Sequence, residues 1–133
     1  MKLNIVLGVI VLLSGFILAQ EHFQLDRMKN MRDMEVAMST IQKGFLYNNL
    51  NVVKNGVKDL KRTVSHTESF IKEGVSKKGI NNLIYAKKQT ESITVLADEI
   101  LLSFEKGDQY NAANGYLQVL SKCLSCHQTV RSW

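Results

Sequence analysis

The sequence predicts an all-α protein, an antiparallel up-down-up-down bundle of four helices. Three observations support this fold class. The chain of 133 residues contains no proline, the residue that most strongly interrupts helices. Apolar residues recur at intervals of three and four through four successive segments, which is the spacing of one helix face. Short polar or glycine-containing breaks separate these segments, so neighbouring helices should pack side by side.

The first 19 residues are predicted to be a targeting segment, followed by the bundle at residues 20–133. Lys2 supplies a positive start, the run from Leu3 to Ala19 is almost wholly apolar, and Ala19 is small enough for signal peptidase cleavage. The alternative is an uncleaved N-terminal anchor that tethers the protein. This apolar run is at the short limit for a membrane span, which needs about 20 apolar residues. Either alternative exports the bundle, which predicts a periplasmic location.

Residues 20–47 and 52–73 are predicted to form the first two helices. The polar run from Asn48 to Asn51 should end the first helix. Gly74 is of the type that caps the C-terminus of a helix, and it should end the second. The inward faces are expected to carry Met31, Met34, Met38, Ile41 and Phe45 in the first helix, and Val53, Val57, Leu60, Val64, Thr67, Phe70 and Ile71 in the second.

Residues 80–106 and 109–131 are predicted to form the third and fourth helices. Gly107 should end the third, and Asp108 is a favourable N-cap for the fourth. Gly115 inside the fourth helix suggests a bulky neighbour pressed against the backbone. The inward faces are expected to carry Leu83, Ala86, Thr90, Ile93, Ala97, Ile100 and Phe104 in the third helix, and Tyr110, Ala113, Leu117, Leu120, Leu124, His127 and Arg131 in the fourth.

The charge pattern and the absence of catalytic motifs exclude several classes of function. The chain has 17 basic and 12 acidic residues, a net charge of +5, and no run of more than two basic residues. This pattern predicts a mildly basic solvated surface rather than a site for nucleic acid. The sequence shows no catalytic triad, carboxylate pair or phosphate-binding loop, so we do not expect an enzyme.

Both cysteines lie in the run Cys123-Leu124-Ser125-Cys126-His127 near the C-terminus. Two thiols separated by two residues and followed by a histidine are typical of covalent attachment of a c-type haem. Each thiolate adds to a vinyl group of the porphyrin to form a thioether, and the histidine offers its imidazole to the iron. We therefore expect one covalent haem c, bound through Cys123 and Cys126, with His127 as the proximal ligand.

Two other uses of these cysteines remain open. A redox-active disulfide belongs at the start of a helix that follows a strand, whereas this motif lies late in an all-helical chain. A structural zinc site usually takes four protein ligands, and only His22 and His66 remain to complete one, at no recognisable spacing. One alternative hypothesis is therefore a helical bundle that contains no haem and is cross-linked by a disulfide between the two cysteines.

In organisation, nearly the whole mature chain resembles the class II cytochromes c, the family of cytochrome c′ and its low-spin relatives. These proteins carry their haem on the last helix of a four-helix bundle. Two motifs carry the resemblance: Arg131 follows His127 by four residues, and Arg27 precedes Met31 by four residues in the first helix. The lack of proline departs from family members whose loops contain it.

The resemblance implies that the residue at position 31 decides the chemistry of the haem. In five-coordinate cytochromes c′ an apolar side chain there blocks the sixth site, and nitric oxide or carbon monoxide binds the iron. In the low-spin branch a methionine ligates the iron. Met31 therefore predicts an electron-transfer haem with His/Met ligation, with Met28 and Met34 as alternative ligands and the gas-binding cytochrome as the alternative function. Methionines at helical spacing also serve packing, and iron has only one vacancy for them.

The remaining expectations concern the haem edge and the partners. Arg27 and Arg131 are candidates to contact the haem propionates or the haem edge. His66 lies one step off the inward face and His22 lies near the start of the first helix, so both are expected at the surface. The expected partners are redox proteins, and the resemblance adds a homodimer through the first two helices.

Overall fold

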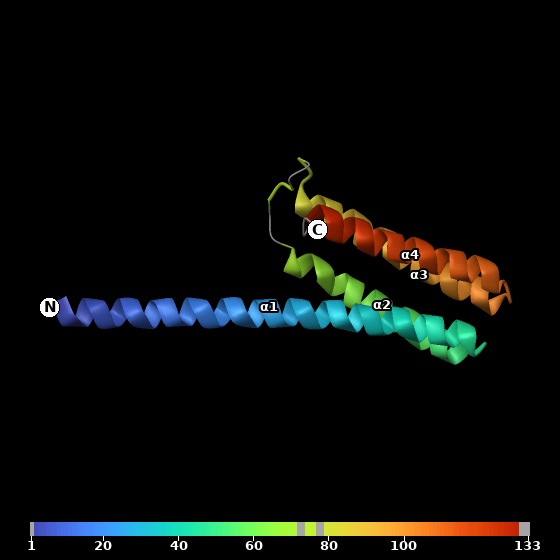
Figure 1. The fold of residues 1–133 in the computed structure, drawn as a ribbon, viewed down its shortest axis with the longest axis horizontal. Coiled ribbons are helices and arrows are strands. Elements are labelled where there is room, and N and C mark those ends of the chain that lie inside the picture. The colour runs from blue at the N-terminus through green and yellow to red at the C-terminus, as the bar shows by residue number, and fades with distance from the viewer. Residues whose placement is uncertain (1, 72–73, 77–78, 131–133) are drawn as a thin grey trace.

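In the computed structural model the described part of the chain forms four α-helices (Figure 1). Their bounds are Lys2–Leu46 for α1, Leu50–His66 for α2, Asn82–Glu105 for α3 and Gln109–Val130 for α4, and a short 3-10 helix, η1, follows α2 at Thr67–Phe70. The structure describes residues 2–71, 74–76 and 79–130, and of residues 2–20 only the backbone. Within these ranges there is no strand, which confirms the all-α fold class. The predicted targeting segment lies outside the residues whose side chains are described.

The helices are arranged as two hairpins. α1 packs along α2, and α3 packs along α4, with turns at residues 47–49 and 106–108. The contact between α2 and α3 joins the hairpins, whereas α1 and α4 make few contacts. Figure 1 shows that the α1 and α4 ribbons come closest near these turns and diverge toward the C-terminus.

Polar caps set several of the helix boundaries. The Asn49 Oδ1 atom accepts a hydrogen bond from the Val52 amide, and the Asn81 Oδ1 atom accepts one from Ile84. As predicted, α3 ends before Gly107, whose φ is 78°, and Asp108 caps α4 through a 3.0 Å bond from the Asn111 amide. These caps satisfy backbone groups that would otherwise lack partners at the helix ends.

The second helix is shorter than the sequence predicts. α2 ends at His66, and the chain continues as η1 to Phe70 before Ile71 becomes extended. An isolated β-bridge between Val75 and Asn81 closes the loop that leads into α3. The prediction of α-helix was wrong from residue 67 to residue 71, because an apolar spacing of three continues through a 3-10 turn as well as through an α-helix. Residues 72 and 73 of the predicted helix lie outside the described residues.

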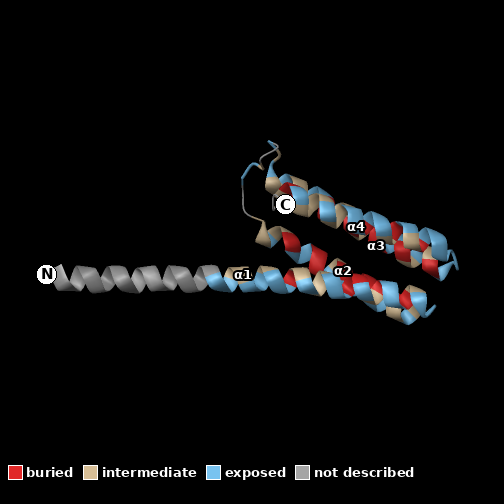
Figure 2. Ribbon diagram, viewed as in Figure 1, coloured by how far each residue is buried: buried red, intermediate tan, exposed pale blue. Residues whose placement is uncertain are grey.

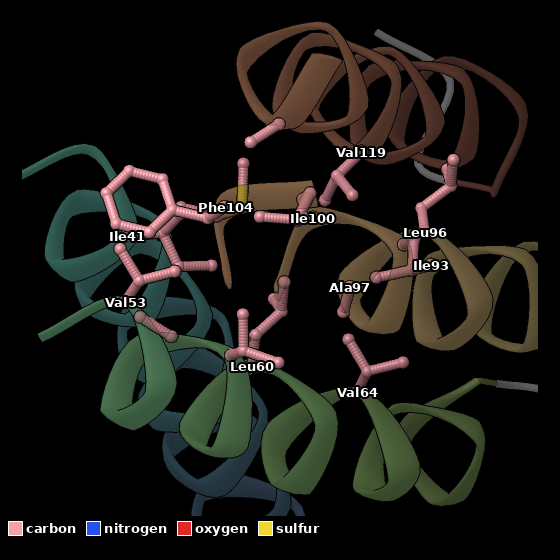
Figure 3. Packing of buried hydrophobic residues seen from close by; sticks show 14 residues of the cluster. Ile41, Val53, Leu60, Val64, Ile93, Leu96, Ala97, Ile100, Phe104 and Val119 are labelled. Carbon is pink, nitrogen blue, oxygen red and sulfur yellow. The ribbon is translucent and has the colours of Figure 1, made fainter. Parts of the chain in front are cut away.

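A single core of apolar side chains joins all four helices (Figure 3). Each large aliphatic side chain in it contributes about 1.5–3 kcal/mol when fully buried. The predicted inward faces of α2 and α3 are confirmed at most positions, including Leu60 and Ile100, which have no exposed surface. The buried members are Ala37, Met38 and Ile41 of α1, Val53, Val57, Leu60 and Val64 of α2, Ile93, Leu96, Ala97, Ile100 and Phe104 of α3, and Ala112 and Val119 of α4.

Small residues bring the helix backbones of each hairpin close together. A Cβ atom on Gly56 of α2 would lie 2.7 Å from the Ile41 Cγ1 atom and 2.8 Å from the Ile41 backbone nitrogen of α1. A Cβ atom on Gly115 of α4 would lie 2.9 Å from the Ile100 Cγ1 atom of α3. The bulky neighbour that the sequence suggests for Gly115 is therefore Ile100.

The inward face predicted for α4 was wrong at its leucines. Leu117, Leu120 and Leu124 are 60%, 43% and 47% exposed, and Tyr110 is 93% exposed. The buried face instead carries small side chains and one valine, namely Ala112, Gly115, Val119 and Thr129. Figure 2 colours buried residues red along the ribbon. Small residues allow α4 to approach α3 closely, and this approach turns the leucines toward the surface.

Candidate functional site

The run from Cys123 to His127 lies in the C-terminal half of α4. Cys123, Cys126 and His127 are each partly buried, and both cysteines are free thiols. His127 is four residues after Cys123, so the helical repeat places it on the same face, one turn further along. The site therefore offers two sulfur nucleophiles and one imidazole within a little more than one helical turn.

The surroundings of the two thiols favour their protonated form. Burial raises the pKa of Cys123 from 9.0 to about 11, with a further increase from the neighbouring charge of Cys126 and a smaller opposing effect of a backbone hydrogen bond. Burial also raises the pKa of Cys126. Cys123 packs against the hydrophobic core, which explains why its thiolate is the more strongly disfavoured. Without a cofactor these thiols are weak nucleophiles near neutral pH.

Tyr116, about two turns before Cys123 in α4, connects α4 to α1. Its ring lies edge-on to Phe45 of α1, with ring centroids 6.0 Å apart. Phe45 also stacks on Phe104 of α3 at 5.4 Å. Burial, followed by the neighbouring charge of Cys123, raises the pKa of the Tyr116 hydroxyl. Phe45 and Tyr116 thus define the sides of α1 and α4 that face each other.

The four methionines of the first helical segment lie in different environments. Met38 is in the core at 8% exposure, whereas Met28 is 61% exposed. Met34 is partly buried, and its sulfur lies 3.6 Å from the Thr67 hydroxyl. Met31 is also partly buried. In the helical repeat Met31 lies seven residues before Met38 and fourteen before Phe45, so it lies on the same side of α1 as these two residues.

The other predicted site residues differ in burial and in their hydrogen-bond partners. Arg27 is partly buried, and its guanidinium donates a hydrogen bond to the Gln24 side chain. His22 is exposed and pairs with Asp26 at 3.0 Å, and His66 is exposed, as expected for both histidines. Arg131 lies outside the described residues.

Asn30 is a buried polar residue that the sequence patterns did not single out. It is 8% exposed and donates a 3.3 Å hydrogen bond to the Thr67 hydroxyl. No motif marks it, because its position becomes informative only when α1 lies against η1. Gln89 on α3 is likewise 8% exposed, and its Oε1 atom has no hydrogen-bond partner.

The donors present fit a covalent c-type haem better than a metal ion alone. Two thiols can form thioethers, an imidazole and a thioether are common axial ligands of haem iron, and apolar side chains stand exposed beside them on α4. Among the residues whose side chains are described, no group of three or more His, Cys, Asp or Glu side chains is arranged to hold a metal ion. Over the same residues, no helix is long and apolar enough to cross a membrane.

Comparison of the chain with protein-family models, with curated proteins and with solved structures finds no match.

Proposed function

We propose that this protein is a periplasmic, monohaem c-type cytochrome that carries single electrons. In this proposal Cys123 and Cys126 bind the haem covalently, His127 is the proximal ligand, and Met31 is the distal ligand. One observation carries the proposal: two free, partly buried thiols and a histidine lie within about one turn of α4. The bundle is of the class II cytochrome type, with antiparallel up-down-up-down topology.

The contact between Phe45 and Tyr116 supports the pairing of Met31 with His127. In an antiparallel arrangement, steps toward the N-terminus of α1 correspond to steps toward the C-terminus of α4. Met31 lies 14 residues before Phe45, and His127 lies 11 residues after Tyr116. The two positions therefore differ by three residues, about 4.5 Å along the helix axis. A flat ligand between α1 and α4 would have one of them on each face.

The exposed leucines of α4 also support a large apolar ligand. Leu120 and Leu124 are close to half exposed and lie beside Cys123 and His127 on α4. Contiguous apolar surface of this kind commonly marks a binding site. A porphyrin attached at Cys123 and Cys126 would cover part of it, and each 100 Å² of apolar surface removed from water would contribute about 2.5 kcal/mol.

The chain's own residues would then have separate tasks. A bound haem supplies one-electron redox chemistry. The thioethers of Cys123 and Cys126 fix its position, and His127 offers a nitrogen to the iron. The Met31 thioether would be the second side chain to hold the iron, and a thioether ligand of this kind would raise the reduction potential of the haem. Arg27 has five donor groups, so it retains hydrogen-bonding capacity for a propionate, and Arg131 is proposed for the same role.

The partners in this proposal are redox proteins that exchange electrons at the haem edge. An uncleaved N-terminal segment would tether the cytochrome to the membrane, and a pair of chains would associate through α1 and α2. Cleavage near Ala19 would release it into the periplasm.

The test is the absorption spectrum of the exported protein, reduced and oxidised, together with peroxidase staining for haem on a denaturing gel. Haem that survives denaturation and a low-spin reduced spectrum are expected. The Met31→Leu variant should become high-spin and bind carbon monoxide at once. A high-spin wild type would favour the five-coordinate, gas-binding cytochrome c′, and a chain without haem stain would favour the disulfide-stapled bundle.

A further inference from the structure

Asn30 and Thr67 form a buried polar contact between α1 and η1. Both are nearly inaccessible, at 8% and 5% exposure. The Asn30 Nδ2 atom donates to the Thr67 Oγ1 atom at 3.3 Å. Burial of such groups is costly unless they are hydrogen-bonded, so each residue holds the other in place.

The sulfur of Met34 lies within reach of both residues. The Thr67 Oγ1 atom is 3.6 Å from the Met34 Sδ atom, and the Asn30 Nδ2 atom is 4.0 Å from it. The Thr67 hydroxyl has a second acceptor, the Thr63 carbonyl at 3.4 Å, and its single proton is shared between the two. The Met34 thioether is thus directed toward η1, which follows α2.

We propose that Asn30 and Thr67 are positioning residues that select the distal ligand of the haem by retaining the Met34 sulfur at the contact between α1 and η1. This inference rests on the proposed function. Met34 is the main competitor of Met31, since it is three residues away and similarly buried. Met38 is buried in the core, and Met28 is largely exposed. With Met34 retained, Met31 supplies the thioether that faces α4.

The strength of the effect follows from the hydrogen bonds involved. A neutral hydrogen bond shifts an equilibrium by about fivefold. Removing the Thr67 hydroxyl takes away the closer donor to the Met34 sulfur and also the acceptor that fixes the Asn30 side chain. The population of Met34 side chains released from this contact should therefore rise by about fivefold or more.

The test uses the holoprotein and the spin state of its haem. Met31→Leu should be high-spin, because Met34 remains at its contact with Thr67. Met31→Leu combined with Thr67→Val should regain a low-spin component, with slower carbon monoxide binding, because Met34 then becomes free to ligate. The matched control is Met31→Leu with Thr63→Val, since Thr63 is a buried threonine one turn earlier that donates to the backbone carbonyls of Asp59 and Leu60. This control should stay high-spin.

Three results would overturn the inference. They are a Met31→Leu variant that is already low-spin, a Met31→Leu/Thr67→Val variant as fully high-spin as Met31→Leu, or a Thr63→Val control that also becomes low-spin. Haem staining of the wild type is read separately and decides the proposed function.

A second measurement needs no haem: the rate at which peroxide oxidises Met34 to its sulfoxide in the haem-free full chain. This rate should rise in Thr67→Val, while the rate at exposed Met28 stays constant.

Discussion

Replacement of Gly56 by alanine should destabilise the bundle, although alanine is the better helix former. The added methyl group would lie 2.7 Å from the Ile41 Cγ1 atom, 2.8 Å from the Ile41 nitrogen and 3.1 Å from the Ala37 carbonyl oxygen. Two of these three atoms belong to the backbone of α1, so they cannot move aside by a rotamer change. The helices of the first hairpin would have to separate.

The expected magnitude combines two opposing effects. Overpacking costs about 1–3 kcal/mol, and contact with rigid backbone places Gly56→Ala near the upper end. The change from glycine to alanine within a helix stabilises the folded state by about 1 kcal/mol. The net loss of unfolding free energy is therefore about 2 kcal/mol. For a chain of this size it should lower the Tm by about 7 °C.

The matched comparison is Gly115→Ala, measured by thermal and urea unfolding under the same conditions. There the new methyl group would meet the Ile100 Cγ1 atom at 2.9 Å, and the next atoms lie at 3.8 and 3.9 Å. A side chain can adjust, so the cost of about 1 kcal/mol should nearly cancel the gain in helix propensity. A Gly56→Ala variant as stable as the wild type, or no more destabilised than Gly115→Ala, would refute the reasoning.

Two further predictions concern the core and the thiols. Leu60→Ala, at a position with no exposed surface, should lower the unfolding free energy by about 2–5 kcal/mol, and a urea midpoint close to the wild-type value would contradict the packing. Burial raises the pKa of Cys123 from 9.0 to about 11 in the folded, haem-free chain, so the unfolded chain loses this proton first as the pH rises. The haem-free protein should therefore lose stability from pH 9 to about pH 11. The loss should be smaller in Cys123→Ala, and equal losses in the two chains would show that this thiol has no part in it.

Apolar spacing was sufficient to predict the four helices and most of the core. It selected the buried faces of α2 and α3, although α3 also exposes Ile84, Val95 and Leu102. For example, Val53, Leu60, Ile93 and Ile100 are all buried as predicted. The spacing was insufficient on α4, which has two apolar faces. One is lined by small residues and packs against α3, and the other carries the leucines. Size, rather than hydrophobicity, decides between them, since only the small face permits a close approach of the helices.

The candidate site could be predicted only in part. Cys123, Cys126 and His127 form a contiguous motif, so their proximity follows from the sequence alone. The environment of Met34 does not, because the contact of Asn30 with Thr67 joins residues 37 positions apart. The packing of α1 against η1 sets that contact, and local spacing carries no information about it.

The proposed function is tested most directly by the visible spectrum of the reduced protein, exported in cells able to attach haem c and purified intact. A single covalently bound haem with a low-spin spectrum, converted to a high-spin spectrum by Met31→Leu, is the expected result. A purified chain whose Cys123 and Cys126 are both free or joined in a disulfide, with no haem absorbance, would contradict it.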